Sequence, residues 1–364
     1  MTDNKQNKFW GKVKKYLNHV FIDGLSGMAL GLFATLIIGT IIAQIGSLIG
    51  GKAGEYINMV ASVAKALTGA GIGFGVAYKF KESILVSVSA GVAGMVGAFA
   101  ASILAGTAFP GTGLLLLGPG EPLGAFLGAL AGIEIGHLVS GKTKVDILVT
   151  PLVTITAGSA AGLLIGPPIS KFMEAVGAVI NWGAEQQPFI VGLVVAVVMG
   201  CVLTLPISSA ALGIILKLSG LAAGAAVAGC CAQMIGFAVS SYRENKVNGL
   251  IAQGLGTSML QMPNIVRKPV IWIPPIVASA IAGPLSAWAL KMTCDATGSG
   301  MGTSGLVGPI MTFKTMLADG FPVWYTLLSI IGVQFILPAV ISLFVSELMR
   351  KKGIIKLGDM KLDM

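Results

Sequence analysis

Long apolar segments separated by short polar turns run through most of the chain and limit its possible folds more than any other feature. A helix needs about 20 mostly apolar residues to cross the hydrocarbon of a bilayer. Inside lipid, a spanning segment must also satisfy its own backbone hydrogen bonds, which a helix does within one segment. The pattern therefore predicts an all-α integral membrane protein.

Charge supports this class, because only 11% of the 364 residues are charged, against about 25% in soluble domains. A surface this poor in charge has to face lipid. We expect about ten transmembrane helices, and the eighth, which is polar and rich in glycine, should be interrupted or re-entrant. The predicted spans are 25–50, 56–78, 83–107, 122–140, 145–167, 188–215, 219–240, 247–265, 270–290 and 323–348.

Basic residues are distributed unequally between the two sides of this ten-span arrangement. Seventeen of the 24 fall on the side of the N-terminus and six on the other side. The positive-inside rule therefore predicts a protein of the cell membrane with both ends in the cytoplasm. It also accounts for the net charge of +9 without nucleic acid as a partner. Residues 1–24 should form a cytoplasmic amphipathic segment, 25–349 the transmembrane domain and 350–364 a basic cytoplasmic tail.

One string in the sequence has the spacing of a cofactor motif. GHLVSGKT at 136–143 fits GxxxxGK[ST], but it ends an apolar span and does not follow a strand, so we do not expect it to form a nucleotide-binding loop. The four cysteines do not have the spacing of a metal site. We therefore expect no cofactor and no metal. Any energy for transport must come from an ion gradient or a separate partner protein.

Ionisable residues in or beside apolar spans are candidates for a functional site, because they are costly in a bilayer. Glu121 and Pro122 follow four leucines and a Gly-Pro-Gly turn, as at the tip of a re-entrant hairpin. The alternative is an extracellular turn in which Glu121 caps the next helix. Glu134 and His137 share a helix face and are suited to a hydroxylated solute or a proton relay. The alternative for these two is a polar pair without a functional role.

Two further polar segments lie in the second half of the chain, and both contain the string Gly-Thr-Ser. Interrupted helices often present backbone groups and amides to a substrate near the membrane midplane. Uncharged polar groups suit a neutral, hydroxyl-rich solute, although small-residue packing alone would also explain them. The candidate substrate-binding residues from these segments are Gln253, Thr257, Ser258, Gln261, Asn264, Thr303 and Ser304.

The segments GKTKVDILVTPLVTITAG (141–158) and GLIAQGLGTSMLQMPNIVRKPVIWIPP (249–275) resemble stand-alone sugar-phosphotransferase IIC (EIIC) membrane proteins, a group that includes the perfringolysin regulator PfoR. The resemblance implies an EIIC-like transporter fold, a homodimer and a role in phosphoenolpyruvate-dependent sugar uptake. Its Gly-x-x-Glu-Pro loop is similar to GPGEP at 118–122, which implies contact between Glu121 and sugar hydroxyls. His137 is then a second candidate contact.

The resemblance also implies that separate EIIB and EIIA proteins supply the phosphoryl group, since the sequence shows no such segment. We therefore expect no catalysis by this chain alone. The leading hypothesis is a permease that moves a small sugar-like solute by alternating access. Two alternatives stay open at this point: a membrane sensor that regulates gene or toxin expression, and a gradient-driven transporter of a non-sugar solute that uses Glu134 and His137 as its proton site.

Overall fold

The computed structural model describes residues 15–111 and 113–362. These residues form helices and connecting loops, with one isolated β-bridge between Gly220 and Cys294. In the labels, η marks short 3-10 or π-helical segments. The first half of the chain contains η1 (His19–Gly24), α2 (Leu25–Leu32), η2 (Phe33–Ile37), α3 (Ile38–Ile49), α4 (Gly51–Ala66), α5 (Thr68–Lys79), α6 (Ile84–Ala98), α7 (Ala100–Leu104), α8 (Pro122–Val139) and α9 (Asp146–Ala184).

The second half is more fragmented and begins with α10 (Pro188–Thr204), α11 (Ser209–Ile215), α12 (Gly220–Ser240), α13 (Tyr242–Ile251), η3 (Ala252–Gly256), η4 (Ser258–Gln261) and α14 (Met262–Arg267). It continues with η5 (Pro269–Trp272), α15 (Ile273–Pro284), η6 (Leu285–Ala289), α16 (Ala296–Ser299), η7 (Ser304–Leu306), α17 (Val307–Ala318), α18 (Val323–Ser329), η8 (Ile330–Ile336) and α19 (Leu337–Lys351).

Helices long and apolar enough to cross a membrane number six among the described residues, or seven when the bent pair α4–α5 is taken as one span. α6 and α10 are apolar but shorter. The expected all-α membrane class is confirmed, and the count of ten stays a prediction. The first of these helices is continuous from Lys15 to Ile49, so the described part of the amphipathic segment leads directly into α2. Residues 1–14 of that segment lie outside the described residues.

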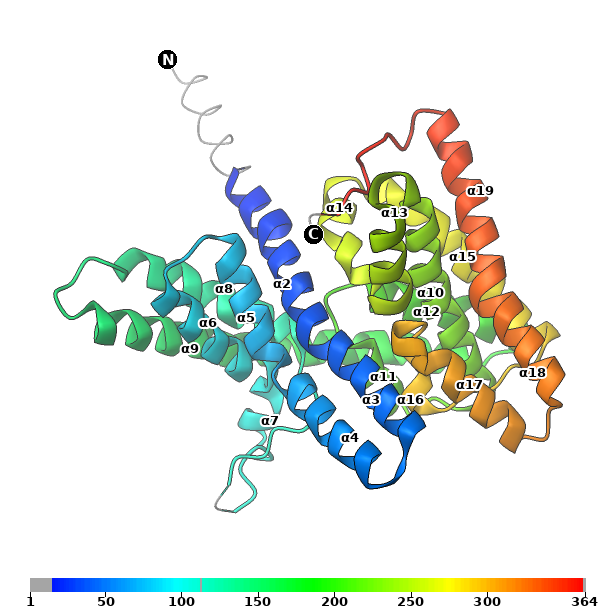
Figure 1. Ribbon diagram of the computed structural model, residues 1–364, viewed down its shortest axis with the longest axis horizontal. Helices are drawn as coiled ribbons and strands as arrows, with labels where there is room; N and C mark the ends of the chain where they lie inside the picture. The colour runs from blue at the N-terminus through cyan, green and yellow to red at the C-terminus, as the bar shows by residue number, and fades with distance from the viewer. Residues whose placement is uncertain (1–14, 112, 363–364) are drawn as a thin grey trace.

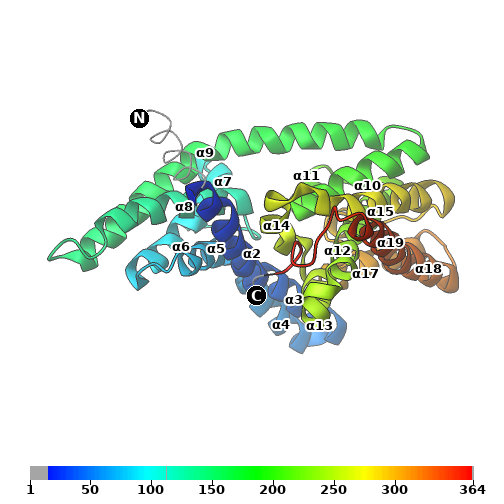
Figure 2. The same ribbon diagram turned by 90° about the horizontal axis from the view of Figure 1, so that it is seen from above.

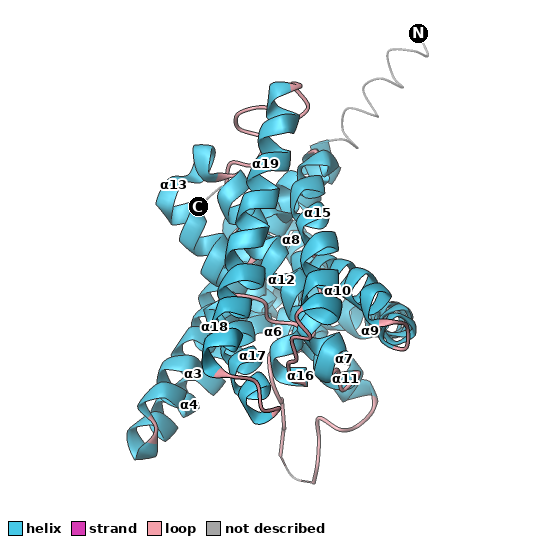
Figure 3. Cartoon of the chain, turned by 90° about the vertical axis from the view of Figure 1, so that its right-hand side faces the viewer, coloured by secondary structure: helices cyan, strands magenta, loops and turns pink. Residues whose placement is uncertain are grey.

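The helices gather into two bundles on either side of the α2–α3 rod (Figure 1). α5, α6 and α8 form one bundle, and α10, α12, α15 and α19 form the other. α9 runs from the first bundle to the second (Figure 2). Each bundle has its own buried apolar cluster, and α12 is the most enclosed helix of the second. Seen from the side, the second bundle stands upright beside the sloping α3–α4 hairpin (Figure 3).

Small residues set the spacing between helices, as expected where lipid gives no hydrophobic drive to helix pairing. α2 packs on α5 at glycine positions. A methyl group added at Gly31 would lie 2.0 Å from the carbonyl oxygen of Gly71, and one at Gly27 would lie 2.4 Å from that of Gly75. These helices touch backbone to backbone, which a side chain at either position would prevent.

Two predicted spans need correction. The helix expected to end at 167 continues to Ala184, with Pro151, Pro167 and Pro168 inside it. The span expected to be continuous over 188–215 is broken after Thr204. Pro206 has no N–H for a helical hydrogen bond, and the chain resumes helix only when Ser208 caps α11 through the backbone N–H of Ala211. This interruption, residues 205–208, places Ile207 and Ser208 at the candidate site.

Candidate functional site

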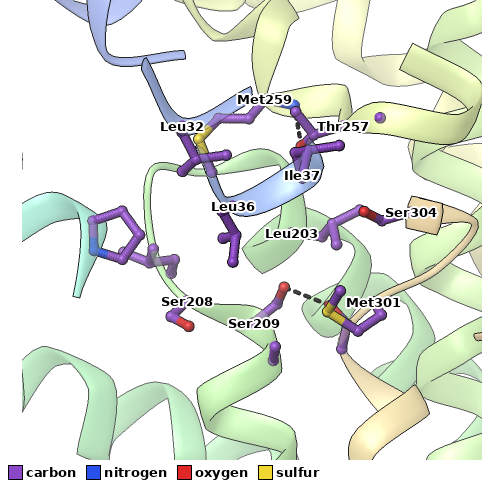
Figure 4. A pocket seen from close by; sticks show the side chains of 15 residues that line it. Leu32, Leu36, Ile37, Leu203, Ser208, Ser209, Thr257, Met259, Met301 and Ser304 are labelled. Atoms are coloured by element: carbon purple, nitrogen blue, oxygen red, sulfur yellow. Dashed lines mark hydrogen bonds between the residues drawn. The ribbon is translucent and has the colours of Figure 1, made fainter. Parts of the chain in front are cut away.

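The interrupted segments meet around one internal cavity, the central pocket, which lies where α2 and η2 cross the second bundle (Figure 4). Each wall comes from a different part of the chain. The lining residues are Leu32, Leu36 and Ile37 from α2 and η2, Pro122 from the start of α8, Leu203, Ile207, Ser208, Ser209 and Ala210 around the 205–208 break, Gly256, Thr257 and Met259 from η3 and η4, and Gly300, Met301 and Ser304 before and in η7.

Glu121 lies at the edge of this pocket because the turn before it can adopt a left-handed conformation. Gly120 has φ +70°, and an added Cβ there would lie 2.7 Å from the Cβ of Ala98. The backbone N–H of Glu121 donates to the Ala98 carbonyl at 2.8 Å, which fixes the loop against α6. The carboxylate accepts from the backbone N–H of Leu123 at 3.5 Å, and the Ser208 backbone is a second polar neighbour. Glu121 thus caps α8 and lies between two residues of the pocket lining.

Thr257 and Ser258 are held by a buried hydrogen-bond network. The Thr257 hydroxyl accepts from the backbone N–H of Met259 at 3.2 Å. The hydroxyls of Ser258 and Thr204 are 2.8 Å apart, and Thr204 donates to the side-chain carbonyl of Gln233 at 3.3 Å. The network is continued outside this segment by the Trp272 indole, which donates to the same carbonyl at 2.8 Å, and by Ser279, which accepts from the Gln233 amide at 3.2 Å. Three helices of the second bundle, α10, α12 and α15, therefore position the Thr257 wall of the pocket.

Ser304 differs from these residues, because its hydroxyl is buried and has no hydrogen-bond partner among the described residues. An unpaired buried hydroxyl costs about 1–3 kcal/mol. The backbone beside it is also strained: Leu306 has φ +60°, a conformation that costs about 1–3 kcal/mol for such a residue. Ser304 lines the pocket, and Leu306 ends the same short helix, η7. A ligand hydroxyl in the pocket would give the Ser304 hydroxyl the partner that it lacks.

The pocket is narrow, with a cavity volume of about 50 Å³. This volume holds a few water molecules and is well below the roughly 300–1,000 Å³ of ordinary small-molecule sites. Binding of a larger solute therefore requires α2 and η2 to move away from η3, η4 and η7. The polar groups are in place, and the space between them is nearly closed.

Glu134 and His137 lie outside the central pocket. The His137 ring contacts the Glu82 carboxylate, with Nδ1 2.9 Å from Oε1, at the turn between α5 and α6. The His137 side chain is 68% exposed and the Glu82 side chain 10% exposed. Glu134 instead contacts the hydroxyl of Tyr16. The two residues share a helix, but each has a partner from another part of the chain and neither lines the pocket.

Gln253, Gln261 and Asn264 also lie away from the pocket lining, in a ladder of buried amides. The Gln261 amide donates to the side-chain carbonyl of Gln253 at 2.9 Å, and the Asn264 amide donates to that of Gln261 at 2.9 Å. The remaining candidate, Thr303, donates to the sulfur of Met234 inside the second bundle. Of the eleven candidates from sequence, Pro122, Thr257 and Ser304 line the pocket, Glu121 lies at its edge, and Ser258 lies behind Thr257.

Ser208 and Ser209 are pocket residues that sequence reasoning missed. Ser209 donates to the Gly300 carbonyl at 2.7 Å and thereby joins two walls of the pocket. The signal was present in the string Leu-Pro-Ile-Ser-Ser at 205–209, since a proline followed by two serines interrupts an apolar span. Within the described residues no group of three or more His, Cys, Asp or Glu side chains is arranged to hold a metal ion.

Comparison with known families gives a match over nearly the whole chain. Residues 22–362 match the family model described as phosphotransferase system, EIIC. The chain belongs to the EIIC family. This EIIC protein is accordingly a multi-pass membrane protein of the phosphotransferase-type permeases, as its apolar helices also indicate. A search of curated proteins found no match.

Proposed function

We propose that this EIIC protein binds a small, polyhydroxylated, sugar-like solute in the central pocket and moves it across the cell membrane by alternating access. The observation that carries the proposal is the unpaired Ser304 hydroxyl at a pocket where the interrupted segments converge. A solute hydroxyl would satisfy it, since a hydroxyl both donates and accepts. Glu121 at the pocket edge would accept a stronger, charge-assisted hydrogen bond from a second solute hydroxyl.

Movement of the solute follows from how the pocket is closed. Leu32, Leu36 and Ile37 form an apolar wall on α2 and η2, opposite the polar wall that contains Thr257 and Ser304. Separation of these walls on one side of the membrane at a time would admit and release a solute. The polar groups would stay on their own bundles during this movement. A moving apolar wall is suited to this role, because it separates without breaking hydrogen bonds.

Thermal stability of the purified protein with a panel of sugars tests the binding site. One sugar at least should raise the midpoint of unfolding, because a ligand that binds only the folded state stabilises it. Ser304→Ala should weaken the apparent affinity about fivefold, corresponding to loss of a hydrogen bond worth about 1 kcal/mol. Glu121→Gln should weaken it more. Glu134→Gln is the matched control and should bind normally, because Glu134 lies away from the pocket.

Two results would contradict the assigned site: no stabilisation by any sugar, or equal stabilisation of the native protein and Glu121→Gln. Counterflow of the stabilising sugar in proteoliposomes then tests transport. Binding without flux would favour the sensor hypothesis. Flux that disappears when a proton gradient is collapsed would favour gradient-driven transport over phosphorylation coupling.

The cellular arrangement forms part of the same proposal. We expect cytoplasmic termini, a homodimer, and separate EIIB and EIIA proteins that phosphorylate the arriving sugar. Membership of the PfoR-like group within the EIIC family belongs to this proposal as well. Co-purification from membranes tests the protein partners, and native mass spectrometry of the solubilised protein tests the dimer.

A further inference from the structure

The last described residues turn back from α19 and dock on the molecule as a segment of bends and turns, 354–362, called here the C-terminal tail (Figure 1, red trace). Asn245 holds this tail by its backbone. Its amide nitrogen donates to the Met360 carbonyl at 2.8 Å, and its amide oxygen accepts from the Leu362 N–H at 2.8 Å. One asparagine side chain thus pairs with a carbonyl and an N–H two residues apart in the tail.

The amide ladder described above provides the other attachments. Gln261 donates to the Met360 carbonyl and Asn264 to the Lys361 carbonyl, each at 2.9 Å. At the edge of the tail, Lys268 forms an ion pair of 2.5 Å with Asp359. Gln261 and Asn264, which the sequence suggested as contacts for a solute, therefore bind a segment of the chain itself.

Apolar side chains anchor the tail as well. Met360 is fully buried and Leu362 is 8% exposed. Leu362 packs into a small cluster with Ala29 from α2 and Leu260 from η4, bordered by Phe33 and Ala252. It therefore touches both sides of the seam between α2–η2 and residues 252–260.

The same seam contains part of the central pocket. Leu32 and Leu36 line the pocket on the α2 side, three residues beyond Ala29 and Phe33, a rise of about 4.5 Å along a helix. Phe33 joins the two places, since its ring lies where a side chain on Gly256, a pocket residue, would otherwise stand. Leu362 thus fills the seam one helical turn from the pocket.

We propose that the C-terminal tail is a latch that holds α2 against residues 252–260 and keeps the central pocket closed toward the face where the tail lies. While Leu362 is docked, its side chain packs against both sides of the seam, so α2 and residues 252–260 cannot separate there. When the tail undocks, α2 is free to move away from η3 and η4, and the pocket opens toward that face. The inference rests on the proposed function only in taking this pocket as the one that must open.

The test uses the full-length protein in detergent, with Ser304→Cys as a reporter in a Cys201→Ser background. Ser304 is buried and its hydroxyl has no hydrogen-bond partner among the described residues, so cysteine replaces it without loss of a contact there. The rate at which a water-soluble methanethiosulfonate labels this cysteine measures pocket opening, and peptide mass spectrometry follows it separately from other thiols. Leu362→Ser should raise the rate about tenfold, the factor that corresponds to about 1.4 kcal/mol. Leu357→Ser is the matched control, because Leu357 is 75% exposed in the same tail.

A second arm holds the tail in place with a short, reducible crosslink between cysteines substituted at Ala29 and Leu362. Labelling should become slower than in the uncrosslinked protein and recover after reduction. Equal labelling rates in Leu362→Ser, in the protein with its native tail and in the crosslinked protein would overturn the latch. Equal acceleration of labelling by Leu357→Ser would overturn it too. If Leu362→Ser does not fold, the crosslink arm decides alone. The labelling needs no solute, so it is independent of whether any sugar binds.

Discussion

The ion pair between Arg350 of α19 and Glu244 of α13 allows a direct test of how strongly the two helices depend on a buried charge. The side chains are 8% and 2% exposed. One guanidinium nitrogen lies 2.8 and 3.0 Å from the two carboxylate oxygens and donates to the Ser240 carbonyl at 3.0 Å. Arg350→Met would leave the carboxylate buried without its cation, which costs about 3–5 kcal/mol.

The same two helices contain a matched control. Arg243 of α13 and Glu347 of α19 are also 2.8 Å apart, but their side chains are 60% and 30% exposed. Because water screens an exposed pair, Arg243→Met should cost about 0–1 kcal/mol. The expected difference between the two variants is therefore about 2–5 kcal/mol, at equal distance and with the same residue types.

Unfolding in mixed micelles with increasing dodecyl sulfate measures both free energies of unfolding in one assay. A double variant, Arg350→Met with Glu244→Gln, should recover part of the loss, because it removes the stranded charge. Equal losses for Arg350→Met and Arg243→Met, within about 1 kcal/mol, would refute the argument that burial decides the strength of these pairs.

Three further predictions concern packing, the buried network and pH. Gly31→Ala should destabilise the protein by about 1–3 kcal/mol or more, since its methyl group would overlap a facing carbonyl, whereas Gly332→Ala, with open space around it, should be tolerated; equal unfolding midpoints would contradict close helix contact. Gln233→Leu should cost about 1–3 kcal/mol by leaving buried donors unpaired, measured in the same micelle assay, and a neutral result would show that the network adds nothing. Partial burial raises the pKa of Asp359, but hydrogen bonds from Lys268 and the Lys356 N–H, with the charges of Lys268 and Arg350, together hold that pKa below its ordinary value. The pair with Lys268 therefore stabilises tail docking above about pH 4, and this stabilisation is lost as pH falls through the lowered pKa. The protection of the tail amides, measured as the intrinsic exchange rate divided by the observed rate, should therefore fall only in acid, and Asp359→Asn should show this lower protection already at pH 7; equal protection in both proteins would contradict the role of this pair.

Sequence predicted much of the local structure because its signals are local. Gly120 and the neighbouring prolines indicated a sharp turn at Glu121, and the Gly-Thr-Ser string at 256–258 indicated an interrupted helix. The structure has a break at each place. The break after Thr204 was the exception, because the surrounding residues are so apolar that one proline did not outweigh them.

The partners of polar side chains were not predictable in the same way. Glu134 and His137 were expected to act together from their helical spacing, yet Glu134 contacts Tyr16 and His137 contacts Glu82 in the turn between α5 and α6. The polar residues of 253–264 divide between two roles, because Thr257 lines the pocket while Gln261 holds the C-terminal tail. Spacing along one helix shows which face a residue lies on, but the opposing element decides what it contacts.

The sequence by itself determined that this chain is a helical membrane protein and that its helices are interrupted at Glu121 and at 256–258. Hydropathy and backbone chemistry act over a few turns of helix, so both can be read from adjacent residues. Only the tertiary structure decided that Pro122, Ser208, Thr257 and Ser304 surround one pocket and that Leu362 of the tail packs against Ala29 and Leu260 beside it. These residues lie far apart in the chain, and close packing of small side chains between helices brings them together.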